Sequence, residues 1–90
     1  MKVFLSSSFA KKVKKLKKQQ KADLDIAVKD IIENPAIGVE KKGDLKGIFV
    51  HKFKIQKTLF LLAYRIVDQN LELIMLGPHE NYYRDLKTYI

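Results

Sequence analysis

The chain has 90 residues, of which 47% are hydrophobic. A chain of this length can bury one real core but not two, so we expect a single domain over residues 1–90. Its lack of cysteine excludes disulfide bonds and thiolate chemistry. The apolar start is too short for a signal peptide and no run approaches the ~20 residues of a membrane span, so we expect a cytoplasmic protein.

Positive charge is concentrated near the N-terminus. Lysine and arginine outnumber aspartate and glutamate by 18 to 10, giving a formal net charge of +8. Such an excess indicates an anionic partner, and eight lysines precede the first acidic residue, Asp23. A solvated helix face is the other explanation of a lysine run. The excess over acids favours a binding surface, whose partner could be nucleic acid, a membrane surface or an acidic protein. For nucleic acid, the candidate contacts are Lys11, Lys12, Lys14, Lys15 and Lys18.

The first half of the chain predicts a strand and two helices. Residues 2–5 are β-prone, and the three serines that follow can cap a helix start. The narrow apolar stripe within residues 9–16 predicts an amphipathic surface helix. A wider apolar face within residues 24–32 predicts a second helix, which Pro35 would end. A turn over residues 19–23 would join the two helices into an antiparallel hairpin.

The second half predicts a sheet and a terminal helix. β-branched and aromatic runs over residues 48–55, 58–67 and 71–76 are separated by turn residues, which indicates an antiparallel meander. The middle run is apolar on both faces, as expected of a central covered strand. Residues 81–90 predict a short helix with Asn81 as its cap. The order is typical of an α+β fold, with the helical hairpin packed on a mostly antiparallel four-stranded sheet.

Candidate chemistry lies in the sheet and beyond its last strand. Strand alternation puts Lys52 and Lys54 on one face and His51 on the other. Paired lysines on an exposed face can simply prevent edge pairing, and a structural role stays open for both His51 and His79. If Arg65 and His79 converge with the lysines, however, the group suits RNA cleavage.

RNA cleavage without a metal needs a base for the 2′-hydroxyl proton, cations for the charge on phosphorus and an acid for the leaving 5′-oxygen. Lysine, histidine and arginine can fill these roles, and unpaired bases can stack on tyrosine. We find no motif for a metal or a cofactor and expect neither. The expected catalytic group is Lys52, Lys54, Arg65, His79 and Tyr83. His51 and Arg84 are further candidates for nucleic-acid contacts.

Four stretches carry a family resemblance: GDLKG at 43–47, HKFK at 51–54, LLAYR at 61–65 and LGPHENYY at 76–83. With the helical hairpin in front, their order and spacing resemble the RelE/ParE superfamily of type II toxin–antitoxin toxins, and particularly its ParE-like branch. The resemblance covers essentially the whole chain. It implies a toxin that stops growth until an antitoxin encoded beside it neutralises it.

The resemblance implies two possible activities, since RelE-type members cleave mRNA in the ribosomal A site and ParE-type members inhibit DNA gyrase. Lys52 and Lys54 match the two lysines of the RelE pattern, and His79 and Tyr83 match the histidine and aromatic residue of YafQ-like relatives. Leu61 departs from the pattern, because RelE has an arginine in this strand.

We favour a ribosome-dependent mRNA endonuclease. His79 would act as general acid or base, Lys52 and Lys54 would stabilise the charged phosphorus, and Tyr83 would orient or stack the nucleotide. The alternatives are a non-enzymatic gyrase inhibitor and a nucleic-acid-binding module without toxicity. The expected partners are the antitoxin with the ribosome and mRNA, or else gyrase, and neither a membrane nor a small-molecule substrate.

Overall fold

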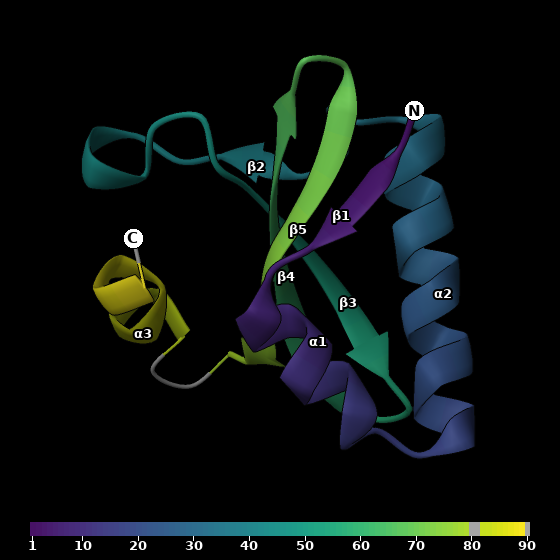
Figure 1. Ribbon diagram of the computed structural model, residues 1–90. Coiled ribbons are helices and arrows are strands. Elements are labelled where there is room, and N and C mark those ends of the chain that lie inside the picture. Colours follow the sequence, from purple (N-terminus) through teal and green to yellow (C-terminus); the bar gives the residue numbers. More distant parts are fainter. Residues whose placement is uncertain (80–81, 90) are drawn as a thin grey trace.

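The computed structural model describes residues 1–79 and 82–89, and in it a five-stranded sheet carries helices on both faces (Figure 1). The elements in chain order are β1 (Val3–Leu5), α1 (Ser7–Lys14), α2 (Lys18–Glu33), β2 (Val39–Glu40), the 3₁₀ turn η1 (Gly43–Leu45), β3 (Phe49–Ile55), β4 (Thr58–Val67), β5 (Asn70–Pro78) and α3 (Tyr82–Tyr89). The predicted α+β fold class is confirmed. The predicted cap Asn81 lies outside the described residues.

The strand order is β1-β5-β4-β3-β2. β1 pairs with β5 in parallel, and the other neighbouring pairs are antiparallel. The sheet has one strand more than predicted, because β2 pairs its two residues with Val50 and Phe49 at the start of β3. A strand of two residues is too short to show an alternating pattern in the sequence.

The predicted turn over residues 19–23 is wrong, since the chain breaks between α1 and α2 earlier, at residues 15–17. The backbone N–H of Lys17 donates to the side-chain oxygen of Gln20 at 2.8 Å, which stabilises the start of α2. No large apolar residue lies between Leu16 and Leu24. Apolar spacing therefore could not locate the break within the lysine run.

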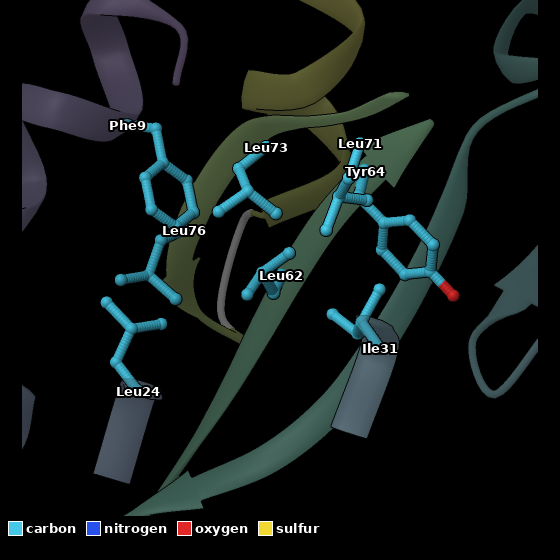
Figure 2. Close-up of a cluster of buried hydrophobic side chains, with 8 residues drawn as sticks. All are labelled: Phe9, Leu24, Ile31, Leu62, Tyr64, Leu71, Leu73 and Leu76. Atoms are coloured by element: carbon cyan, nitrogen blue, oxygen red, sulfur yellow. The ribbon is translucent and has the colours of Figure 1, made fainter. Parts of the chain in front are cut away.

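α1 and α2 cover one face of the sheet, which we call the α1–α2 face, and the main core lies beneath them (Figure 2). Its buried side chains come from both helices and from β4 and β5: Phe9, Leu24, Ile31, Leu62, Tyr64, Leu71, Leu73 and Leu76. The Tyr64 hydroxyl donates to the carbonyl oxygen of Pro35 at 2.7 Å and accepts from the N–H of Gly38 at 3.0 Å. This phenol joins the link after α2 to the central strand.

α3 covers part of the opposite face, which we call the α3 face. A second cluster lies there, made of Leu45, Ile48, Val50, Leu61, Ala63, Ile74, Tyr82 and Leu86. Residues 61–64 of β4 are all 0% exposed, which confirms the predicted central strand covered on both sides. Over the described ranges, no helix combines the length and the apolar character that crossing a membrane requires.

Two phenylalanines test where the stability resides. Phe9 is 1% exposed in the main core, whereas Phe4 on the edge strand β1 is 51% exposed. Phe9→Ala should lower the free energy of unfolding by about 3–5 kcal/mol, since it removes a packed ring and leaves a cavity. Phe4→Ala should change it by roughly 1 kcal/mol or less. Urea denaturation of both variants measures the difference, and equal losses would contradict this core assignment.

Candidate nucleic-acid interface

Strand alternation divides the side chains of β3 between the two faces. Phe49 and Phe53 pack against the main core, and Val50 belongs to the cluster on the α3 face. Lys52 and Lys54 follow the alternation of Val50 and are exposed. The two lysine side chains therefore leave β3 on the α3 face.

The register extends from these lysines across the sheet to the end of β5. Lys52 pairs with Leu61, and Leu61 pairs with Gly77, so the three residues form one row across three strands. Two strand spacings separate Lys52 from Gly77, about 10 Å between Cα atoms. His79 is two residues beyond Gly77, is exposed, and its carbonyl oxygen accepts from the N–H of Tyr82 at 3.3 Å. The chain at His79 thus reaches the same end of the sheet as the lysine pair.

Arg65 is not brought to this end. It alternates onto the α3 face but pairs with Glu72, four residues along β4 from Leu61, which is about 13 Å away. Its guanidinium donates to the Glu72 carboxylate from Nη2 at 2.9 Å and from Nε at 3.0 Å. The expectation that Arg65 converges with Lys52 and Lys54 is therefore not met.

His51 lies on the opposite face from the lysines. It is half-buried toward α2, and its ring stacks on Phe53 with centroids 5.9 Å apart. Burial lowers the pKa of His51 below its ordinary value, while the negative charge of Asp30 on α2 opposes the shift. The predicted grouping of His51 with the nucleic-acid-binding residues is not supported, because the imidazole packs between β3 and α2.

Tyr83 and Tyr82 lie in the first turn of α3. Tyr82 is buried, and its hydroxyl donates to the carbonyl oxygen of Met75 at 2.8 Å, so it fixes α3 to β5. Tyr83 is half-buried, and its ring meets Tyr82 edge-on at 5.7 Å. The ammonium nitrogen of Lys41 lies 4.9 Å from the Tyr83 ring centroid. Sequence reasoning did not single out Lys41, because its contact with Tyr83 depends on how α3 packs on the sheet.

The N-terminal lysines occupy the end of α1, the link and the start of α2, rather than one helix. Lys11, Lys14, Lys15 and Lys18 are exposed, and Lys12 is partly covered. Arg84 is exposed on α3. These side chains can meet a polyanion at the surface.

The end of the sheet thus carries two exposed lysines on β3 and an exposed histidine just beyond β5, on either side of the buried Leu61. Ammonium groups can stabilise a developing negative charge, and an imidazole can transfer a proton near neutral pH. Among the histidine, aspartate and glutamate side chains that the structure describes, no three are grouped as metal ligands.

Residues 3–87 match the family model of the ParE-like toxin of type II bacterial toxin–antitoxin systems. The chain belongs to this family. The toxin class expected from the four sequence stretches is therefore confirmed for nearly the whole chain. No curated protein matches the sequence at a significant level.

Solved structures of toxins share the fold at low sequence identity. The YoeB/ParE toxin from Agrobacterium tumefaciens aligns with a TM-score of 0.71 and 19% identity, over 88% of this chain and 99% of that one. A chain of the intact E. coli RelBE toxin–antitoxin complex gives 0.69 and 20%, over 88% and 96%. YafQ from E. coli gives 0.62 and 20%, over 90% and 96%. The toxin family thus keeps its fold here while most side chains differ.

The environment of His51 can be tested by NMR titration of its imidazole. We expect a pKa below the ordinary value of about 6.5, because burial disfavours the charged ring. Asp30→Asn should lower it further by removing the opposing charge, and Asp25→Asn on the same helix should leave it unchanged. A folded-state pKa below the unfolded value means that this contribution to stability is present above about pH 6.5 and is lost as pH falls through the folded pKa. A His51 pKa above the ordinary value would contradict the buried placement.

Proposed function

We propose that this toxin is a ribosome-dependent mRNA endonuclease that inhibits translation and growth. The observation that carries the proposal is the row of paired residues from Lys52 through Leu61 to Gly77, which brings the lysine face of β3 next to the chain at His79. RNA cleavage without a metal requires cations for the charge on phosphorus and a side chain that can transfer a proton, and lysine and histidine can supply these.

In the proposed reaction a base takes the proton of the RNA 2′-hydroxyl, and the 2′-oxygen attacks the neighbouring phosphorus. The bond from phosphorus to the 5′-oxygen breaks, an acid protonates that oxygen, and a cyclic phosphate remains on the other fragment. His79 serves as the acid or the base. Lys52 and Lys54 stabilise the additional negative charge on phosphorus. Tyr83 orients the nucleotide, and Arg65 takes no part because it is bound to Glu72 at the other end of β4.

The lysine run from Lys11 to Lys18 serves as the ribosome-binding surface in this proposal. Its members are mostly exposed and precede all acidic residues of the chain. Contacts to RNA phosphates release counterions, so binding weakens steeply as salt rises. This surface belongs to the α1–α2 side of the molecule, which leaves the α3 face for the message.

Gyrase inhibition is the second candidate, and one observation favours it. Leu61 stands where the RelE pattern has an arginine, and its side chain is 0% exposed between Lys52 and Gly77. The candidate site therefore carries one fewer cation than the RelE pattern implies. In this case the basic surface and α3 would bind protein, and the histidines would be structural.

The first test is primer extension on message translated in the presence of purified toxin. The wild-type chain should produce truncated mRNA, and His79→Ala should slow cleavage by roughly 10²–10⁴-fold, the usual contribution of one proton-transfer group. The thermal midpoint should stay unchanged, because His79 is exposed. The matched control is His51→Gln, which alters the other histidine on the opposite face and should keep cleavage nearly intact. Uncut message together with inhibited supercoiling by gyrase would refute the endonuclease proposal.

Lys52→Ala and Lys54→Ala test the cationic pair separately from the proton transfer. Each should reduce the cleavage rate at saturating ribosome, since removing one stabilising group from the transition state costs about 10²-fold or more. Lys57→Ala in the adjacent turn removes the same charge outside the proposed site and serves as control. An equal loss from all three substitutions would indicate only a general effect of charge on binding.

An antitoxin partner gives a further prediction, since structures similar to this chain include toxin–antitoxin complexes. An acidic amphipathic segment should cover the basic and apolar surfaces of this toxin. Co-expression with the protein encoded beside it should yield a soluble complex and restore growth. Failure to isolate such a complex at low salt would count against the proposed partner.

A further inference from the structure

A second basic feature lies on the α3 side of the sheet, separate from the lysine pair of β3. It is a hollow of about 330 Å³ lined by Glu40, Lys41, Lys42, Gly43 and Lys46. Three lysines against one glutamate give it an excess of positive charge. Figure 1 shows the segment around η1 extending to the same side of the sheet as α3.

The loop that forms this hollow is fixed by a hydrogen bond between its two ends and by a buried leucine in its middle. The N–H of Lys41 donates to the carbonyl oxygen of Ile48 at 2.8 Å, and Leu45 is buried in the cluster beneath α3. Gly43 and Gly47 have φ angles of +70° and +86°, a region that glycine adopts without strain. The backbone around the hollow is therefore shaped by packing and by glycine.

Its cations are available to a ligand. Lys41 places its ammonium group 4.9 Å from the Tyr83 ring centroid, a cation–π contact that positions the charge without neutralising it. Neither Lys42 nor Lys46 forms an ion pair with any residue in the described ranges, and both are exposed. A negatively charged ligand would thus meet positioned and unpaired ammonium groups.

The hollow and the lysine pair lie along one line on the same face. Ile48, Val50 and Lys52 follow alternate positions, and the first two belong to the cluster beneath α3. The backbone of Lys41 is hydrogen-bonded to that of Ile48. Ile48 precedes Lys52 by four residues, which corresponds to about 13 Å between their Cα atoms in an extended chain. One phosphate group is too small to bind at both places. A chain that carries several phosphates can bind at both.

We propose that the hollow formed by Lys41, Lys42 and Lys46 is a second phosphate-binding subsite, which holds the RNA chain at a nucleotide distant from the one at Lys52 and Lys54. The inference rests on the proposed function, because it takes RNA as the ligand of the α3 face. An acidic protein segment is the competing ligand. RNA is favoured because the charged hollow lies in line with a second cationic site and beside an aromatic ring, the combination that nucleic-acid channels use.

The experiment measures binding of fluorescein-labelled oligouridines to the purified full chain, without ribosomes, by fluorescence anisotropy. The triple variant Lys41→Gln, Lys42→Gln and Lys46→Gln should weaken binding of an octanucleotide by about tenfold. It should also reduce the slope of log affinity against log salt by about 0.7 for each phosphate that the variant no longer binds. A dinucleotide spans one subsite only, so in an NMR titration that follows the signals of Lys52 and Lys54 it should bind at that pair with unchanged affinity. The triple substitution of the same lysines by arginine should retain octanucleotide binding.

The matched control is the triple variant Lys2→Gln, Lys29→Gln and Lys57→Gln, which removes the same charge away from the hollow. It should bind the octanucleotide as the wild type does. An equal loss in both triple variants would overturn the inference, and so would a loss of affinity only for an acidic antitoxin peptide. Because no cleavage is measured, an octanucleotide affinity that depends on the hollow supports the subsite even if His79→Ala leaves message cleavage intact.

Discussion

Burial of β4 on both faces is the constraint on which the arrangement of this toxin depends. Residues 61–64 are fully buried, alternately beneath α3 and beneath α1 and α2. A shift of β3 by one residue against β4 would turn Lys52 and Lys54 toward the main core and His51 toward α3. Burying two unpaired ammonium groups costs far more free energy than the hydrogen bonds between the shifted strands would contribute. The core thus fixes which face carries the cations.

The bulge between β4 and β5 determines what lies opposite these cations. From Val67 to Tyr64 the two strands pair regularly, and then Ala63 pairs with Met75, so that Ile74 is the extra residue. If the regular pairing continued beyond Tyr64, Ala63 would pair with Ile74 and Leu61 with Leu76. The bulge instead turns Leu76 into the main core and places Gly77 beneath the ring of Tyr82. One inserted residue therefore places Gly77, two residues before His79, in the same cross-strand row as Lys52.

From the sequence, the sheet face of each side chain could be predicted better than its position along the sheet relative to neighbouring strands. Alternation is a property of the extended backbone, so Lys52, Lys54 and His51 could be assigned to opposite faces. The turn at residues 56–57 pairs Ile55 with Thr58, and each further pair lies one residue farther along both strands. The last pair is Phe49 with Tyr64, so Arg65 lies beyond the paired part of β3. That count was possible from the sequence and would have separated Arg65 from the lysines. The bulge, the two-residue β2 and the contact of Lys41 with Tyr83 depend on tertiary packing and leave no periodic signal.

Leu61 limits how the proposed site can hold a phosphate. Its side chain lies between Lys52 and Gly77 and is fully buried in the cluster beneath α3, so it offers a phosphate no cation at the position where the RelE pattern has an arginine. Lys52 and Lys54 are exposed, so water screens their attraction for a phosphate. Neither offers a fixed bidentate contact, because lysine holds a phosphate as a mobile point charge. Precise placement of the phosphate must then come from neighbouring contacts along the RNA, which is the role that a second subsite on the same face would fill.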